Sequence, residues 1–547
     1  MATQMAMTRA DARPAEVDFD TMTAADVLAG LPSRIHNIYE PFVRSMPDHP
    51  AFVEGDKAWS YLAFSNAVDA VAADLIKLGV RPGDRIMIAS ENCAAVGAFV
   101  LAASKLDAWA IVANPRLSPR ELDLIYDHSG ARRLFFTTAV SKEAADHAVR
   151  RGAETRWVGL FDQIGVGALN EAAEPEPVHA DPAKQVAVLI YTSGTTGTPK
   201  GVMLTHQNLL FSAKVSAVLR GLGPNDRIYG VLPMSHIVGL TIILVASLMF
   251  GATVLVLPKY DPAHLADSLA QNAVSILYGV PATYQRLLAH SATSGKPLLS
   301  GDLRYALVAG APLDLTLKKR VEQAFGLPLT NGFGITECSP GISGVRASDP
   351  REDDSVGQIL PGVETRVLKP DGSPAAAGEV GELHVRGPNV MLGYYQAPDL
   401  TEKAVDKEGW FATGDLVRFD GPHLFVVGRA KEMIIRSGFN VYPAEVEAVL
   451  NSHPAVLQSA VVGRVVEANE EIVAFVQLVP GSGLAPGELE AFVNPQLTAY
   501  KRPSEIIVLD SFPAGSTGKI LKHQLKERAQ RAWPKLNSAE FQGGYCA

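Results

Sequence analysis

The sequence predicts an α/β protein with a large N-terminal domain of layered α/β subdomains, a β-rich subdomain, and a small mobile α+β C-terminal domain. Strand-like apolar runs alternate with helical patterns over much of the chain. After about residue 353 the pattern changes to short strands separated by turn signals. The length of 547 residues also exceeds what a single hydrophobic core usually supports, so more than one structural unit is expected.

The alternation is clearest in three strand–helix pairs. In each pair a short apolar run precedes a segment with helical spacing of its apolar residues, which is typical of a mostly parallel sheet. The three pairs are residues 84–90 then 94–106, 108–114 then 118–129, and 275–280 then 282–290.

One uncharged segment, residues 237–258, approaches the length of a membrane-spanning helix. Gly251 divides it, and the part after this glycine is rich in β-branched residues. We therefore predict a buried helix, a turn and a strand here, and no integral membrane span.

The sequence pattern after about residue 430 predicts a separate compact unit. Residues 356–387 show short strands with turns, and the unit after them mixes helices with strands. We predict a large domain over residues 1–430 and a small domain over 431–547, with a hinge at Lys431. The predicted elements of the small domain are helices 443–454 and 486–497 and strands 456–464, 471–479 and 505–510.

Composition excludes several classes of protein. The formal net charge is −9, whereas proteins that bind nucleic acids through the phosphate backbone need a basic surface. The cysteines Cys93, Cys338 and Cys546 are widely spaced, so neither a disulfide framework nor a zinc site is expected. The first thirty residues are acidic and lack the apolar core of a secretory signal. Together these features predict a cytoplasmic protein.

Residues 191–201, "YTSGTTGTPKG", follow the strand-like run "QVAVLI". Glycine lets backbone N–H groups approach an anion closely, and threonine and serine add hydroxyl donors. Successive N–H groups in such a turn bind anions, and Lys200 adds a positive charge. The spacing of a Walker A loop is absent, so a phosphate-binding loop of another kind is predicted.

This loop resembles the signature of the acyl-adenylate-forming (AMP-binding) enzymes, and it is similar above all to that of acyl-CoA synthetases. Further motifs match the family in family order, and the resemblance extends from about residue 39 to 525. These motifs are "LPMSHIVGL" at 232–240, "GFGITE" at 332–337, "GELHVRGPNVMLGYY" at 381–395, "WFATGD" at 410–415, "GRAKEMIIRSGFNVYPAEVE" at 428–447 and "PAGSTGKILK" at 513–522.

The resemblance implies a reaction in two steps. A substrate carboxylate attacks the α-phosphate of ATP, giving an acyl-AMP and pyrophosphate, and the thiol of CoA then displaces AMP. Because the nucleophiles belong to the substrates, the protein is expected to act by positioning and by stabilising charge on phosphate oxygens. The implied cofactors and co-substrates are ATP, Mg²⁺ and CoA, and a homodimer is a further expectation.

The resemblance also assigns roles to single residues. Glu337 resembles the ligand of Mg²⁺, Lys519 the lysine that bridges the substrate carboxylate and the α-phosphate, and His236 the residue that gates the acyl pocket. Gly438 resembles the glycine of the loop that faces the thiol substrate. The nucleotide-binding set comprises Thr192, Ser193, Gly194, Thr195, Thr196, Gly197 and Lys200 at the β- and γ-phosphates, Thr336 at the α-phosphate, Gly310, Ala311, Pro312, Gly332, Phe333 and Gly334 near adenine, and Asp415 and Arg429 at the ribose.

Two questions remain open in the sequence. The acyl acceptor is CoA or, as an alternative, a carrier protein. A third hypothesis, a non-catalytic protein that only binds a nucleotide, is less well supported because all the charged motif residues are present. Luciferase-like oxidation has no support. The acid is another open point: the wall "SHIVGL" lacks the carboxylate that a buried α-ammonium needs, which argues against an amino acid. The other candidate wall residues of the acid pocket are small or apolar, which suits an aromatic or arylalkenoic acid, or a medium-chain fatty acid; they are Ile237, Val238, Ala309, Gly332, Gly334, Ser339 and Pro340.

Overall fold

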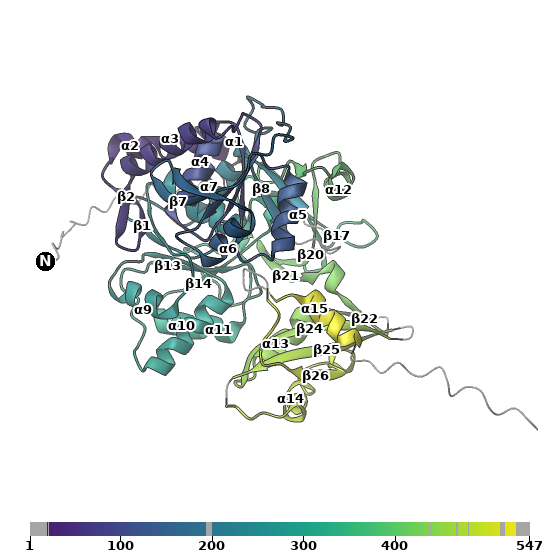
Figure 1. Ribbon diagram of the computed structural model, residues 1–547. Helices are drawn as coiled ribbons and strands as arrows, with labels where there is room; N and C mark the ends of the chain where they lie inside the picture. Colours follow the sequence, from purple (N-terminus) through teal and green to yellow (C-terminus); the bar gives the residue numbers. More distant parts are fainter. Residues whose placement is uncertain are drawn as a thin grey trace, which may run out of the picture. The chain divides into compact units, whose positions relative to one another are not determined.

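The computed structural model describes residue 19 and residues 21–192, 200–437, 439–466, 469–479, 481–514 and 520–531. Two compact units divide the chain (Figure 1). The small unit contains Val367–Leu383, Gly414–Arg418 and the chain from Val426 onward, and the large unit contains the rest. The chain passes between them within β17 (Glu364–Leu368), β18 (Gly381–Arg386), β20 (Phe411–Asp420) and β21 (His423–Arg429). The domain limits 1–430 and 431–547 and the hinge at Lys431 stay predictions.

The first sheet of the large unit has a parallel centre. Its strands are β1 (Pro50–Glu54), β2 (Lys57–Ser60), β10 (Arg227–Gly230), β11 (Thr253–Val256), β12 (Ile276–Gly279), β13 (Tyr305–Ala309), β14 (Leu329–Gly334), β15 (Gly341–Gly344) and β16 (Gln358–Ile359). Their order is β2-β1-β11-β10-β12-β13-β14-β15-β16. The pairs from β1 to β14 are parallel, so those strands end at the same edge of the sheet.

The second sheet of the large unit contains two of the strands predicted from the sequence. Its strands are β3 (Arg85–Ala89), β4 (Trp109–Ala113), β5 (Arg133–Thr137), β6 (Glu154–Val158), β7 (Phe161–Val166), β8 (Val186–Thr192), β9 (Lys200–Thr205) and β19 (Gly393–Tyr394). Their order is β19-β9-β8-β4-β3-β5-β7-β6. Every residue of β3 and β4 is buried, as expected of strands covered on both faces.

Helices fill the space between the two sheets and cover their outer faces. The inner layer holds α3 (Tyr61–Lys77), α4 (Ala94–Lys105), α7 (His206–Leu219), the π-helix η2 (Val238–Val245) and α8 (Ala246–Met249). Helices α9 (Pro262–Ala270), α10 (Pro281–Ser294) and α11 (Leu315–Phe325) cover the first sheet (Figure 1), and α5 (Pro119–Ser129) and α6 (Lys142–Arg150) cover the second. Outside these layers lie α1 (Ala24–Leu28), η1 (Ile35–Asn37), α2 (Glu40–Ser45) and α12 (Pro398–Ala404).

The inner layer is tightly packed. A Cβ atom added to Gly97 of α4 would lie 3.0 Å from Leu244 of η2 and 3.4 Å from Phe52 of β1. The uncharged segment 237–258 contributes helix η2–α8 to this layer and strand β11 to the first sheet, so the predicted helix–turn–strand unit is confirmed. In the part of the chain that the structure describes, no helix is long and apolar enough to cross a membrane.

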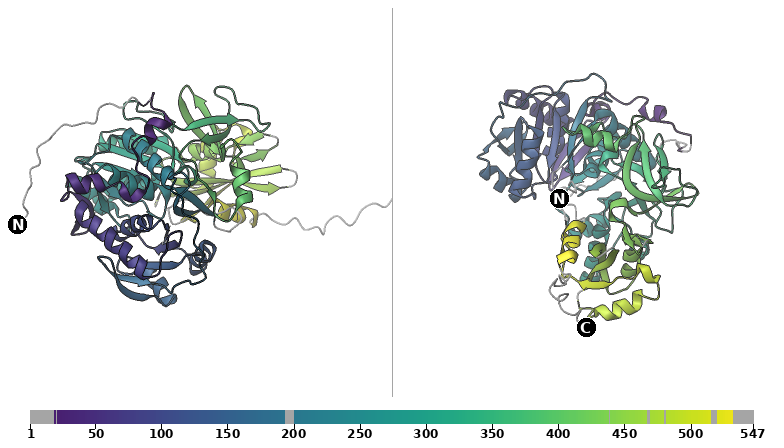
Figure 2. Two further views of the ribbon diagram at one scale, coloured as in Figure 1. Left: turned by 90° about the horizontal axis from the view of Figure 1, so that it is seen from above. Right: turned by 90° about the vertical axis from the view of Figure 1, so that its right-hand side faces the viewer.

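The small unit, green to yellow in Figures 1 and 2, is an α+β unit. Its elements after β21 are η4 (Ala430–Glu432), β22 (Ile434–Arg436), β23 (Phe439–Val441), α13 (Pro443–Asn451), β24 (Val456–Val466), β25 (Asn469–Leu478), α14 (Pro486–Val493), η5 (Ala499–Lys501), β26 (Glu505–Val508) and α15 (Lys522–Arg531). Alternate residues of β24 and β25 face opposite sides of their sheet. Val461 and Ala474 share a cluster with α13 and α14, whereas Val462 and Phe475 share one with α15.

Candidate active site

Predicted adenine-site residues gather at the shared carboxyl edge of the first sheet. Strand β13 ends at Ala309 and the next residues are Gly310, Ala311 and Pro312, all exposed. Ala309 lies opposite Gly332 in the parallel β13–β14 ladder, so the turn after β13 is a neighbour of the end of β14. Gly310 has φ of +83°, a left-handed conformation that glycine adopts without strain. This edge is where ligands usually bind in open α/β sheets.

The end of β14 leads directly into the short helix η3 (Thr336–Cys338). Gly334 is needed there, because an added Cβ would lie 2.0 Å from the carbonyl oxygen of Pro340. The Ile335 N–H donates to the same oxygen at 3.0 Å, which closes the turn. Thr336 is buried and Glu337 is half-buried. Phe333 of β14 pairs with Ser343 of β15.

The predicted phosphate loop connects two antiparallel strands. Strand β8 ends at Thr192 and β9 begins at Lys200, and these two residues are opposite partners in the ladder. The ladder therefore fixes the place of Lys200 and the direction of its side chain. Five predicted loop residues lie outside the described residues: Ser193, Gly194, Thr195, Thr196 and Gly197.

Tyr394 brings Lys200 and Glu337 into one cluster. The phenol hydroxyl of Tyr394 donates a hydrogen bond to Oε1 of Glu337 at 2.9 Å. The ammonium of Lys200 lies 5.1 Å from the centre of the Tyr394 ring. The ladder explains this contact: Tyr394 of β19 pairs with Val202 of β9, and Lys200, two residues before Val202, faces the same side. Thus two residues assigned from separate motifs share one tyrosine.

Tyr394 is not among the site residues predicted from the sequence, although it lies in the motif at 381–395. Two adjacent tyrosines end that motif, and the sequence does not say which of them faces Lys200. The phenol of Tyr395 instead donates to Oε1 of Glu176 at 2.8 Å. Burial raises the pKa of the Tyr394 phenol, and the Glu337 carboxylate raises it further, so this phenol remains a hydrogen-bond donor at neutral pH.

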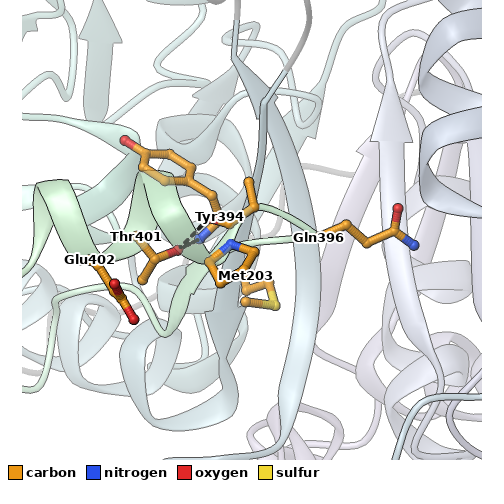
Figure 3. Close-up of a pocket in the computed structure, with 7 residues that line it drawn as sticks. Met203, Tyr394, Gln396, Thr401 and Glu402 are labelled. Atoms are coloured by element: carbon orange, nitrogen blue, oxygen red, sulfur yellow. Dashed lines mark hydrogen bonds between the residues drawn. The ribbon is translucent and has the colours of Figure 1, made fainter.

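The backbone around Tyr394 also ties the two motifs together. The N–H of Met391 donates to the carbonyl oxygen of Glu337 at 2.8 Å, and the N–H of Tyr394 donates to Oγ1 of Thr401 at 2.9 Å. Figure 3 shows the second bond at a shallow hollow beside α12, with the phenol ring of Tyr394 directed away from Met203. The hollow is lined by Met203, Tyr394, Gln396, Ala397, Pro398, Thr401 and Glu402.

His236 lies in the loop after β10, at the same carboxyl edge. The side chain of Asn92 holds this loop: its Nδ2 donates to the carbonyl oxygens of Gly230 and Leu232 at 3.1 and 2.9 Å, and its Oδ1 accepts from Met234 N–H at 2.8 Å. Asn92 is buried and more than a hundred residues away in sequence, so no local pattern pointed to it. His236 itself is half-buried, and its N–H donates to Pro233 at 2.9 Å.

The predicted ribose residues meet within the small unit. Nε of Arg429 lies 2.9 Å from Oδ1 of Asp415, whose side chain is 3% exposed. The preceding Gly414 has φ of +72°, and its N–H donates to Oε1 of Glu382 at 3.1 Å. A buried carboxylate with an arginine partner can accept hydrogen bonds from hydroxyl groups, and the ribose role of this pair stays a prediction.

Two other predicted residues of the small unit, Gly438 and Lys519, lie outside the described residues. On either side of the Lys519 segment, Ala514 and Ile520 form an antiparallel bridge, and Leu521 N–H donates to the carbonyl oxygen of Pro513 at 2.8 Å. Helix α15 starts at the next residue, Lys522.

Lys522 forms ion pairs with two carboxylates of the small unit. Its ammonium lies 2.8 Å from Oε1 of Glu447 on α13 and 3.3 Å from Oε2 of Glu432 in η4. Oε1 of Glu447 also accepts the backbone N–H of Val461 at 2.7 Å. The start of α15 is therefore linked to the segment beside Lys431.

The donor set at Glu337 fits one class of cation. Within the described ranges, no three His, Cys, Asp or Glu side chains are placed to hold a metal ion together. Glu337 offers one carboxylate beside the predicted phosphate loop. Mg²⁺ is commonly held by one or two carboxylates together with substrate phosphates and water. A single glutamate is therefore enough for Mg²⁺ that is bound together with ATP, and it is too few ligands for a metal site built from protein side chains alone.

Comparison with known proteins identifies the family. Residues 39–395 match the AMP-binding enzyme family, and residues 445–519 match the AMP-binding enzyme C-terminal domain. A feruloyl-CoA synthase of an Amycolatopsis species is 34% identical over 489 residues, which cover 89% of this chain and 97% of that protein. The 4-coumarate–CoA ligase 3 of Oryza sativa subsp. japonica is 31% identical over 514 residues, covering 90% of this chain and 91% of the ligase.

A solved structure is similar over the same length. The o-succinylbenzoate coenzyme A synthetase of Bacillus subtilis, in complex with ATP and a magnesium ion, is 30% identical, with 90% of this chain and 99% of that chain covered and a TM-score of 0.76. Fold, ordered motifs and relatives therefore agree. The chain belongs to the AMP-binding enzyme family and is an AMP-forming acid–thiol ligase.

Proposed function

We propose that this enzyme activates an aromatic or arylalkenoic carboxylic acid with ATP and Mg²⁺ and transfers the acyl group to CoA. The observation that carries the proposal is the cluster of Lys200, Tyr394 and Glu337 beside Thr336, at the ends of β9 and β14. A cation and a lone carboxylate at such an edge suit a nucleoside triphosphate with its metal ion.

In the first half-reaction an oxygen of the substrate carboxylate forms a bond to the α-phosphorus of ATP, and the bond to pyrophosphate breaks. Lys200 and Thr336 hold phosphate oxygens, and Lys519 stabilises the negative charge shared by the carboxylate and the α-phosphate. In the second half-reaction the CoA sulfur attacks the acyl carbon, the thiol proton goes to solvent, and AMP leaves. Neither half needs a protein nucleophile, so the protein contributes binding, orientation and charge.

Glu337 is the residue that would hold Mg²⁺, with its carboxylate kept in place by the Tyr394 phenol. The ion supplies charge neutralisation at the phosphate oxygens. Asp415 and Arg429 of the small unit are the proposed ribose ligands, and Gly310 to Pro312 with Gly332 to Gly334 form the proposed adenine wall.

The acid class rests on the wall residues and on the relatives. Two of the relatives are named for aromatic acids, feruloyl and 4-coumarate, and a flat acid fits a wall made of glycine and apolar residues. At Gly332 an added Cβ would meet its first neighbours at 3.5 Å and 3.6 Å, which is ordinary van der Waals contact, so this end of β14 admits a Cβ without a clash. A medium-chain fatty acid is the second candidate, since an apolar wall also accepts an alkyl chain.

We also propose that the enzyme works in the cytoplasm and does not bind nucleic acids, and that it can form a homodimer. The net charge of −9 supports the second statement. Cys93 and Cys338 are buried free thiols, as expected in a reducing compartment. Sedimentation velocity of the purified protein measures the state of assembly.

A panel of acids, assayed with and without CoA, tests the function. We expect pyrophosphate release with ferulic, 4-coumaric and benzoic acids, slower release with octanoic acid and little with acetic acid. CoA should be consumed in proportion to the acid. If acyl-AMP accumulates, CoA stays unreacted, and the phosphopantetheine of a carrier protein takes up the acyl group, the carrier-loading alternative is correct.

The variant Glu337→Gln tests the metal site. Glutamine keeps the shape of the side chain and an oxygen that accepts the Tyr394 hydroxyl, but it removes the charge. We expect adenylation to fall by about 10²-fold or more, in line with the loss of a charged metal contact. Unchanged activity at limiting Mg²⁺ would exclude Glu337 from the metal site.

A further inference from the structure

We propose that Tyr394 is a positioning residue that sets both the metal-binding glutamate and the phosphate-binding lysine, through opposite parts of one side chain. Its hydroxyl holds Oε1 of Glu337, and the face of its ring attracts the ammonium of Lys200. This inference rests on the proposed function, because it takes Glu337 as the residue that meets the metal and Lys200 as the residue that meets phosphate.

The hydroxyl bond orients the carboxylate of Glu337. A carboxylate has two oxygens, and the phenol engages Oε1. Among the described residues, none donates a hydrogen bond to Oε2 of Glu337, and a carboxylate oxygen without a donor is a suitable ligand for a hard cation. Residues that hydrogen-bond to metal ligands commonly determine the ligand's orientation, and their loss typically weakens metal affinity by about 10- to 100-fold.

The ring of Tyr394 acts on Lys200 in a different way. A cation within about 6 Å of a ring centre is attracted to its negative face, and Lys200 lies at 5.1 Å. The antiparallel ladder of β9 and β19 places both side chains on one face of the sheet. The lysine is therefore directed before any phosphate arrives, which lowers the cost of ordering this long side chain on binding.

Tyr394 is itself firmly held, so its hydroxyl can be removed without disturbing the backbone. The chain around it is paired on both sides: Leu392 N–H donates to Met203 at 3.0 Å, and Tyr395 N–H donates to Gly201 at 2.8 Å. Tyr394 is 8% exposed. Tyr394→Phe keeps the ring, its packing and the lysine contact, and it deletes only the bond to Glu337. Tyr394→Leu deletes both contacts.

Tyr395 provides a matched control. It is the next residue, it is also a buried tyrosine, and its hydroxyl donates to Glu176 instead of Glu337. Tyr395→Phe therefore removes a hydroxyl from the same segment without touching either proposed function of Tyr394.

The experiment measures binding and needs no turnover. Mn²⁺ replaces Mg²⁺ as the probe, and its dissociation constant is determined by electron paramagnetic resonance in the presence of a non-hydrolysable ATP analogue. The affinity for the analogue alone is measured calorimetrically in EDTA, and circular dichroism with thermal melting reports whether each variant is folded.

We expect Tyr394→Phe to raise the Mn²⁺ dissociation constant at least tenfold and to leave the metal-free affinity for the analogue unchanged. Tyr394→Leu should weaken both, and Tyr395→Phe neither. The proposal is overturned if Tyr394→Phe binds Mn²⁺ as tightly as Tyr395→Phe while Glu337→Gln binds it poorly. If Glu337→Gln also binds Mn²⁺ like the unaltered enzyme, the proposed metal role of Glu337 fails together with this inference.

Discussion

Replacing Lys522 with methionine should loosen the start of α15 from the rest of the small unit. Methionine has a similar length and keeps the apolar contacts of the lysine stem, but it removes the ammonium that lies 2.8 Å from Glu447 and 3.3 Å from Glu432. Lys522 is also the first residue of α15, where a positive charge opposes the helix dipole. The two carboxylates offset that cost, and without the ammonium they face each other without a shared cation.

The size of the effect follows from exposure. An exposed ion pair contributes about 0.2–1 kcal/mol, whereas removing one partner of a fully buried pair costs about 3–5 kcal/mol. The side chains of Lys522 and Glu447 are 26% and 12% exposed, which lies between these limits. Glu447 keeps one donor, the Val461 N–H. We therefore expect a loss of about 2 kcal/mol in the local opening free energy, which corresponds to about a 30-fold increase in the opening constant.

Hydrogen–deuterium exchange with mass spectrometry measures that constant segment by segment. Peptides that cover α13, β24 and α15 should exchange about 30-fold faster in Lys522→Met, and peptides of the large unit should not change. The control is Lys526→Met, one turn later on α15. Its ammonium is 4.0 Å from Glu470 and its side chain is 50% exposed, so less than about a threefold change is expected. Equal exchange in the two variants would refute the argument.

The effect of Lys522→Met on the local opening free energy should depend on pH. Burial tends to lower the pKa of Lys522, but Glu447 and Glu432 outweigh it, and the net pKa is raised above its ordinary value of 10.5. A raised pKa means that the stabilisation is complete below the ordinary pKa and is lost as the pH rises through the higher pKa of the folded protein. The difference between Lys522→Met and the unaltered enzyme should therefore be constant from pH 7 to 9 and should shrink above about pH 10.5.

Two further predictions concern the reaction. Gly332→Leu should lower activity most for wide or long acids and least for acetic acid in the acid panel, because a bulky side chain would extend from the carboxyl end of β14 beside the proposed acid wall; equal loss for all acids would instead indicate a folding or nucleotide defect. The two half-reactions are assayed separately for three variants. Lys519→Ala should abolish acyl-AMP formation but still convert supplied acyl-AMP and CoA to the thioester, and Gly438→Leu should do the reverse. Lys200→Ala should weaken only the first half-reaction. Equal loss of both halves in Lys519→Ala and Gly438→Leu would contradict a hinge at Lys431 that alternates two orientations.

The regular elements were predictable because their signals are local. The run 118–129 begins with Ser-Pro-Arg-Glu, and in α5 the side chain of Ser118 and that of Glu121 form a capping box. The segment 237–258 divides at Gly251, whose φ of +76° explains why a glycine ends the helix there. Periodicity and turn chemistry decide such elements within a few residues of sequence.

The candidate site was predictable only where a motif follows a strand. Thr336 and Glu337 come directly after β14, so their position at the sheet edge follows from the end of that strand. Tyr394 lies 57 residues beyond Glu337, and its side of the sheet depends on the register of β9 and β19. A shift by one residue would present Tyr395 to Lys200 instead, and register between distant strands is not visible in a local pattern.

The predicted loop residues 193–197, Gly438 and Lys519 lie outside the described residues, so their roles stay predictions. Asn92 is a different case. Its contacts with the loop before His236 span about 140 residues, and nothing in its neighbourhood distinguishes it from other buried asparagines.

Because Thr192 pairs with Lys200, the length of the loop between them can change without changing the direction of the Lys200 side chain. Residues added or removed between these two partners change the length of the connection but leave the lysine at the same rung of the ladder. A residue inserted within β9 after Lys200 would instead rotate the lysine to the opposite face, away from Tyr394. Libraries of altered loop length, grafted between residues 192 and 200, should therefore retain the direction of the positive charge while they change the anion that the loop accepts.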